Sequence, residues 1–221
     1  MSPRARRVPA GRAGRLRLRR SLATAVRGAD LLERKLRLLL DRERMARQAA
    51  EDADQIWRRK LAEAETWLVR GVLIGGERAL AEAAPVERAR VDVQWGALMG
   101  VRHPAAVGWT DPVRSPWEQT PSNTALAHAE TAYRAAARAA AELAAHQAAA
   151  ELLAAEAVRT RQRVRALRRH WIPRLQGELA EAELTLEEAE HEEAVRRRWA
   201  AGHGAPEAEQ ATPRDLRSPS S

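Results

Sequence analysis

The sequence lacks cysteine and phenylalanine, and it contains a single tyrosine among 221 residues. Without cysteine, the chain can form neither a disulfide framework nor a thiolate metal site. So few aromatic residues leave little to fill a thick globular core, and the composition is typical of long helices with a thin core. No apolar run approaches the roughly 20 residues that a membrane-spanning helix needs. The Arg-rich start also lacks the apolar segment of a secretory signal, so we expect a soluble protein that reaches a membrane only through partners.

Basic charge is concentrated at the start of the chain. The net charge is +8, and residues 1–20 contain eight arginines and no acidic residue. Such an arm can bind nucleic acid, an acidic membrane surface or an acidic protein face. Composition alone leaves these three alternatives open.

The first long segment has the periodicity of a helix that pairs with another helix. Its apolar residues follow steps of four and three, which is the seam of a coiled coil. The seam includes Leu18, Leu22, Ala25, Ala29, Leu32, Leu36 and Leu39. No proline interrupts the stretch, so we expect a helix over residues 12–70, about 90 Å long at about 1.5 Å per residue. Residues 1–11 are expected to be a disordered basic arm.

An insert is expected over residues 71–121. Three glycines, at 71, 75 and 76, predict the end of the first helix, and residues 77–84 predict a short helix. Alternation at Val91, Val93 and Trp95 predicts a strand, and residues 101–109 predict a second strand after a turn. Four prolines in residues 104–121 indicate a loop.

The second long helix is expected over residues 122–200, with Ser122 or Asn123 as its N-cap. Its seam is rich in alanine and continues through Leu153, Ala157, Thr160, Val164, Leu167 and Trp171. Beside Pro173 the repeat skips one residue, at the place where a helix would bend. Residues 201–221 are expected to be a disordered tail.

These segments predict an all-α fold, namely a long antiparallel two-helix coiled coil with a small mixed insert (short helix plus β-hairpin) at the turn end. The alanine-only parts of the two seams face each other if the numbers of facing residues sum to about 193. The same register lays the Arg-rich arm along the Glu-rich run that begins at Glu178. Many weak exposed ion pairs of one sign would then fix the orientation.

The sequence contains no constellation that indicates catalysis. The phosphate-binding pattern GxxxxGK[ST] is absent, and the six histidines have no metal-ligand spacing, so we expect no catalytic residue, no cofactor and no metal. The insert instead offers Trp95, Trp109 and Trp117 as partner-docking candidates, although for Trp95 a place in the insert's own core is favoured.

Two stretches resemble a known family, the D subunits of the V-type (V/A-type) rotary ATP synthases and ATPases. Near the start, Gly28, Leu31, Leu32 and Lys35 match the family's Gly-x-x-Leu-Leu-x-x-Lys pattern. Near the end, an Arg-Val-x-Ala-Leu segment precedes Ile172 and Pro173, a Glu-rich run and a basic patch, in the family's order. The resemblance extends over most of the chain.

The resemblance implies a non-catalytic central rotor shaft that couples ATP synthesis or hydrolysis to proton (or sodium) transport. Its partners would be the head subunits A and B, the small F subunit of the stalk and the connecting C (d) subunit, on the cytoplasmic side of the cell membrane. The seam residues Leu18, Leu22, Leu32, Leu36, Val164, Leu167, Trp171 and Pro173 would then carry torque. A coiled-coil scaffold or adaptor is the alternative, followed by a basic nucleic-acid-binding hairpin.

Overall fold

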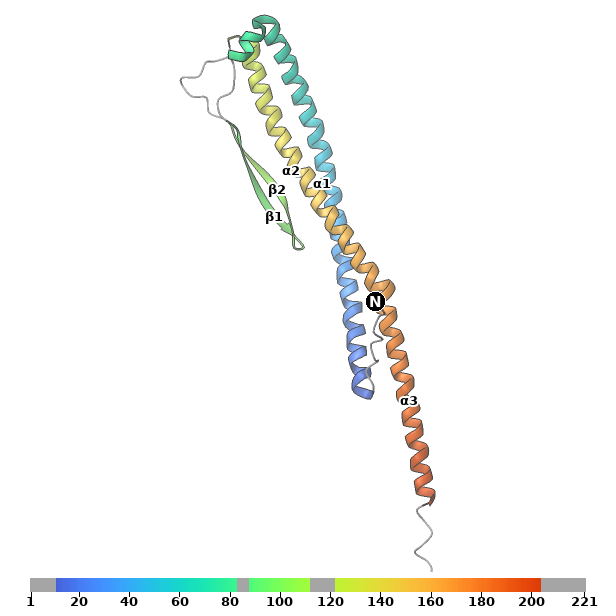
Figure 1. Ribbon diagram of the computed structural model, residues 1–221. Coiled ribbons are helices and arrows are strands. Elements are labelled where there is room, and N and C mark those ends of the chain that lie inside the picture. Colours follow the sequence, from blue (N-terminus) through green and yellow to red (C-terminus); the bar gives the residue numbers. More distant parts are fainter. Residues whose placement is uncertain (1–10, 83–87, 112–121, 204–221) are drawn as a thin grey trace, which may run out of the picture. The chain divides into compact units, whose positions relative to one another are not determined.

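The computed structural model describes residues 11–82, 88–111 and 122–203. Helix α1 spans Gly11–Glu82, and strands β1 (Arg90–Leu98) and β2 (Val101–Thr110) follow it. Helix α2 spans Thr124–Ala166, a π-helical turn η1 spans Leu167–Trp171, and helix α3 spans Ile172–His203 (Figure 1). Two long helical stretches with a two-stranded antiparallel hairpin between them confirm the predicted fold class.

The chain divides into two compact units, which are described separately. One comprises Met1–Gly28 with Ala166–Ser221, and the other comprises Ala29–Arg165. The first unit therefore pairs the start of α1 with η1 and α3. The second pairs the rest of α1 with α2 and includes the hairpin.

In the unit Ala29–Arg165, α1 and α2 run antiparallel along the predicted seam. Leu39, Leu153 and Ala157 form a buried cluster, and Leu36 and Ala46 pack against it. Most of the other buried positions are alanines, which are Ala29, Ala53, Ala64, Ala79, Ala125, Ala129, Ala136, Ala139, Ala149 and Ala150. Such small side chains bury little apolar area each, so the core is thin, as the composition predicts.

Of the three glycines expected to end the first helix, Gly71 and Gly75 lie inside α1, whereas Gly76 interrupts it just before the stretch in which a short helix was predicted. Helix α1 leaves helical geometry only at Gly76, where φ is 70° and ψ is 176°, and then resumes to Glu82. Gly71 lies against Leu126, where a Cβ would lie 2.6 Å from the Leu126 Cδ2 atom. Gly71 therefore allows a close approach between helices, and its lack of a side chain does not mark the helix end.

Asn123 caps α2, as predicted. Its Oδ1 atom accepts a hydrogen bond of 2.9 Å from the Leu126 N–H, the third helical position, which satisfies a donor that has no partner inside the helix. Its Nδ2 group donates to the carbonyl of Gly71 at 3.2 Å, so the same side chain also joins α2 to α1.

The hairpin turns at Met99 and Gly100, which have φ angles of 51° and 82°. Two consecutive positive φ angles are the mark of a type I′ turn, whose twist suits a two-residue hairpin. Trp95 pairs with Pro104 and Gln94 with Ala106, so Ala105 is an extra residue on β2. This bulge accommodates Pro104 inside a strand, although the prolines predicted a loop from residue 104. The rest of that predicted loop, 112–121, lies outside the described residues.

The hairpin folds back along α2 and is not confined to the turn end where the sequence placed it (Figure 1). Leu98 and Val101, which flank the turn, pack against the Leu39–Leu153 cluster. At the other end of β2, Asp111 accepts a hydrogen bond of 3.3 Å from Arg138. The hairpin thus contacts the helical pair at both of its ends.

In the other unit, α3 lies against the first turns of α1. Leu18 and Ala25 are buried on α1, and Ile172, Leu175 and Ala182 are buried on α3, which continues from η1. Arg12 and Arg19 pair with Glu190 and Glu183 at 2.8 and 2.5 Å, which confirms that the described Arg-rich residues face the Glu-rich run. A constant sum of 193 would place Arg19 opposite Arg174, so that register does not hold in this unit.

Candidate functional site

The described residues contain no group of three or more histidines, aspartates or glutamates that could hold a metal ion. In the described ranges, no helix is long and apolar enough to cross a bilayer. The features with functional potential are therefore the seam, its ion pairs and the exposed apolar side chains.

The predicted seam residues lie on the inner faces of the helices, except at the skip in the repeat. Leu18 is buried, and Leu22, Leu32, Leu36, Val164 and Leu167 are partly buried. Trp171 is 44% exposed, and Ile172, its neighbour, is 7% exposed. Ile172 therefore occupies the seam position that the repeat assigned to Trp171, and Pro173 lies on the exposed side.

The motif positions near the start of the chain differ in their surroundings. Leu31 is 63% exposed, so it contributes little to the core of the chain itself. A Cβ at Gly28 would meet no atom within 4 Å. Lys35 differs from both, because its Nζ lies 2.9 Å from Glu156 Oε1 on α2.

The Lys35–Glu156 pair crosses the seam. The side chains retain only 24% and 17% of their exposure, and Glu156 also lies 3.9 Å from Arg159. The hydrogen bond from Lys35 lowers the pKa of Glu156, burial opposes this shift, and the positive charges of Lys35, Arg163 and Arg159 add to it. Glu156 is therefore ionised at neutral pH.

The two tryptophan candidates that the structure describes make few contacts within the chain. Trp95 is 53% exposed, with the Arg102 guanidinium 5.5 Å from its ring centre. Trp109 donates to Asp111 at 2.8 Å. Trp117 lies outside the described residues. Their roles in docking stay predictions.

Sequence reasoning missed an exposed apolar group at the far end of α1. Val69, Leu73 and Ile74 are 59%, 81% and 70% exposed. Their only signal in the sequence is that they are apolar and lie off the seam near the glycines. Nearby, the Trp67 ring stacks on His128 with centroids 4.7 Å apart, and Arg70 lies over Trp67 at 4.8 Å.

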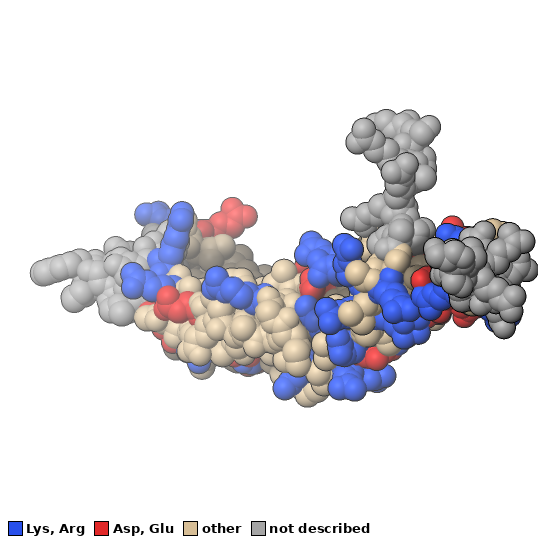
Figure 2. Space-filling model, turned by 90° about the horizontal axis from the view of Figure 1, so that it is seen from below, with Lys and Arg blue, Asp and Glu red and all other residues tan. Residues whose placement is uncertain are grey.

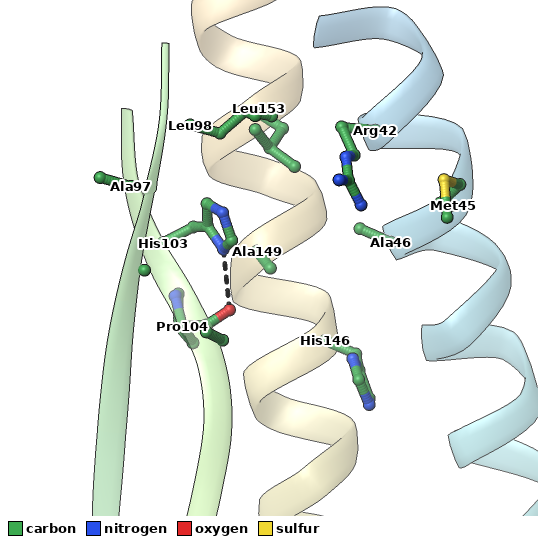
Figure 3. A pocket seen from close by; sticks show the side chains of 12 residues that line it. Arg42, Met45, Ala46, Ala97, Leu98, His103, Pro104, His146, Ala149 and Leu153 are labelled. Carbon is green, nitrogen blue, oxygen red and sulfur yellow. Dashed lines mark hydrogen bonds between the residues drawn. The ribbon is translucent and has the colours of Figure 1, made fainter. Parts of the chain in front are cut away.

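A groove of about 410 Å³ lies between the hairpin and the two helices (Figure 3). His146 points from α2 toward α1, and His103 approaches α2 from β2 while its Nδ1 atom lies 2.9 Å from the Pro104 carbonyl (Figure 3). The walls mix apolar and basic side chains, and no carboxylate lines them.

Charge is spread over the surface. Figure 2 shows basic and acidic side chains interspersed on the face in view. Several arginines pair with a glutamate one turn away on the same helix, such as Arg174 with Glu178 and Arg196 with Glu192. Such pairs neutralise one another locally, which disfavours a single nucleic-acid stripe.

Comparison with known proteins agrees with these features. The family model for the D subunit of ATP synthases matches residues 15–202. The chain belongs to the ATP synthase D-subunit family. It is also similar to the D subunit of the V-type ATP synthase of Thermotoga neapolitana, with 31% identity over 184 residues that cover 81% of this chain and 89% of the relative. The resemblance predicted from the two motif stretches is thereby confirmed.

Membership in the ATP synthase D-subunit family covers almost all the described helices. The matched span covers parts of both units, and it includes the hairpin and the Lys35–Glu156 pair. The family therefore accounts for the chain as a whole and not for one module of it.

Proposed function

We propose that the chain is the central-stalk subunit, the rotor shaft, of a V-type rotary ATP synthase or ATPase. It couples ATP synthesis or hydrolysis in the catalytic head to proton (or sodium) transport and catalyses nothing itself. The observation that carries this proposal is a seam of inward-facing residues on two antiparallel helices, in a chain that belongs to the ATP synthase D-subunit family. A long paired seam resists twisting better than a string of small modules.

The surfaces support contacts with several partners. The termini, with Arg12 and Glu190, are proposed to lie within the head subunits A and B. The exposed group of Val69, Leu73 and Ile74 suits burial against the connecting C (d) subunit, because apolar side chains this exposed usually mark a contact. Trp95 and Trp109 are proposed to face the small F subunit. Contact with the membrane, on its cytoplasmic side, is made only through these partners.

The decisive experiment compares complexes assembled with and without this chain in sealed vesicles. ATP-driven proton uptake should require the chain, and ATP hydrolysis without it should drive no uptake. Undiminished uptake in its absence would overturn the proposal.

A tether tests rotation directly, because the chain has no native cysteine. Leu16 on α1 is 50% exposed. A Leu16→Cys variant joined by a disulfide to the head's inner wall should stop ATP hydrolysis, and a reductant should restore it. Hydrolysis that continues at full rate in the tethered complex would exclude a turning shaft.

A further inference from the structure

The pair Lys35–Glu156 is more enclosed than the ion pairs Arg12–Glu190 and Arg19–Glu183. Its side chains are 24% and 17% exposed, whereas those of Arg12–Glu190 are 79% and 57% exposed. Arg19–Glu183 lies between these extremes, at 55% and 33%. The pair also lies close to the seam cluster that contains Leu39 and Leu153, four and three residues away along each helix.

Along much of α2, away from the Leu39–Leu153 cluster, the apolar contacts define the register of the two helices weakly. The buried face of α2 between Ala129 and Ala150 consists almost entirely of alanine. If α2 slid along α1 by one heptad, alanine would replace alanine at most of these positions, and the buried apolar area would change little. Contacts other than alanine burial must therefore select the observed register, and they include the close approach of Gly71 to Leu126 and the Leu39–Leu153 cluster.

The energy of an ion pair depends strongly on the register, whereas the area that alanine buries does not. A slip of seven residues moves Lys35 by about 10 Å along the seam, far beyond ion-pair distance. In one direction the slip sets Lys35 opposite Arg163, a like charge, and in the other direction opposite Ala149. Both alternatives leave a charge partly buried without its partner, which is strongly unfavourable.

We propose that Lys35 and Glu156 are positioning residues that pin the register of α1 against α2. Arg159, three residues further along α2, lies 3.9 Å from the second oxygen of Glu156 and adds a favourable charge there. Under torque, the pin keeps the two helices from sliding past each other. The role of the pair under torque rests on the proposed function, whereas its role in fixing the register does not.

The test uses disulfide reporters in the full-length chain. Leu39→Cys with Leu153→Cys reports the observed register, because both residues belong to one cluster. Leu32→Cys with Leu153→Cys reports a slip of one heptad. Each reporter is placed in the native background and in the double variant Lys35→Met, Glu156→Met. The double variant removes both charges, so neither is left buried alone.

In the native background the first reporter should crosslink and the second should react at least tenfold more slowly. In the Lys35→Met, Glu156→Met background the two rates should come within about threefold, while helicity measured by circular dichroism stays the same. Exchanging the charges, with Lys35→Glu and Glu156→Lys, should restore only part of the native ratio, because a lysine at position 156 would lie beside Arg159 and Arg163. A ratio that stays unchanged in the Met/Met background would overturn the proposal.

The exposed pair provides the matched control. Arg19→Met with Glu183→Met removes an ion pair of the same type, but it should leave the reporter ratio unchanged. An equal effect of this control would mean that the ratio responds to charge in general, and it would overturn the specific role of Lys35 and Glu156.

The role of the pair under torque can be measured separately, in the assembled complex. The Lys35→Met, Glu156→Met variant should reduce the protons transported per ATP hydrolysed. If the crosslinking test shows a slip but the number of protons transported per ATP is unchanged, only the role of the pair under torque would be overturned. Failure of the proposed function itself is visible independently, as transport that does not need the chain.

Discussion

The backbone N–H of Ile172 donates to the carbonyl of Leu167, a span of five residues where an α-helix spans four. This wide turn absorbs the extra residue in the repeat, so the seam steps directly from Leu167 to Ile172 and Trp171 moves outward. Pro173 follows at once and has no N–H to offer the preceding turn. A π-helical turn is the usual way to insert one residue into a continuous helix.

If η1 exists to absorb one residue, removing a residue from it should be tolerated. Deletion of His170 shortens the step between Leu167 and the isoleucine to four, which restores a regular seam. We expect the melting temperature to rise by about 2–4 °C, the shift that ~1 kcal/mol produces in a chain of this size. Thermal unfolding followed by circular dichroism measures it.

Deletion of Glu181, an exposed residue of α3, is the control. It rotates the following seam residues, Ala182 and Leu186, by about 100° away from α1. This deletion should lower the melting temperature. Equal losses from both deletions would show that η1 does not serve to correct the repeat.

Thr160 is fully buried, and its hydroxyl has no hydrogen-bond partner. Burial without a partner costs about 1–3 kcal/mol, so Thr160→Val, which keeps the shape and removes the hydroxyl, should stabilise the chain by about 1 kcal/mol. Urea denaturation gives the free energy of unfolding. Thr160→Ser keeps the hydroxyl and loses the methyl group, and it should be destabilising. A loss of stability in Thr160→Val would mean that the hydroxyl is satisfied.

The Lys35–Glu156 pair predicts a pH dependence. The pKa of Glu156 in the folded chain lies below its ordinary value of 4.5. Its contribution to stability is therefore complete above pH 4.5 and is lost as the pH falls from there through the folded-state value. The native chain should lose stability over this range relative to Glu156→Gln, in which the contribution is absent at every pH. Urea denaturation between pH 3 and 7 measures the difference.

Glu193 provides the control for this titration. The hydrogen bond from Arg197 lowers its pKa, but the group is fully exposed. Exposed pairs contribute little to stability, so Glu193→Gln should follow the native chain at every pH. A pH dependence that is the same in Glu156→Gln and the native chain would contradict the assignment to Glu156.

The substitution Gly71→Ala should destabilise the chain, although alanine is a better helix former than glycine. The added Cβ would lie 2.6 Å from Leu126 Cδ2 and 2.8 Å from Cγ. Such overpacking costs about 1–3 kcal/mol, which outweighs a helix-propensity gain of about 1 kcal/mol. At Gly177 on α3 a Cβ would meet nothing within 4 Å. Gly177→Ala should therefore stabilise the chain, and a similar gain at Gly71 would exclude the close approach.

The sequence was sufficient to predict the pairing of the helices, because the seam is a repeating pattern that many residues support. Asn123 was also predictable, since an N-cap depends on local chemistry just after the proline at 121. The skip near Pro173 could be located only to within one turn. Trp171 and Ile172 are both apolar neighbours, and the choice between them depends on which backbone turn widens.

Long-range features were not predictable in the same way. A glycine is compatible both with a helix end and with close packing, and only the position of Leu126 distinguishes the two for Gly71. The return of the hairpin along α2 depends on Leu98 and Val101 meeting a cluster built from two distant helices. Lys35 could be matched to a family motif, but its partner Glu156 lies among many glutamates that the sequence does not distinguish.

The bulge around Pro104 affects the tendency of the hairpin to aggregate. An isolated pair of strands has two free edges, each of which can recruit a strand from another molecule and begin aggregation. A proline beside an extra residue interrupts the regular row of donors on β2, so a foreign strand finds no continuous template there. Where many copies are synthesised together before they meet their partners, this proline protects the β2 edge of the hairpin from pairing with a strand of another copy.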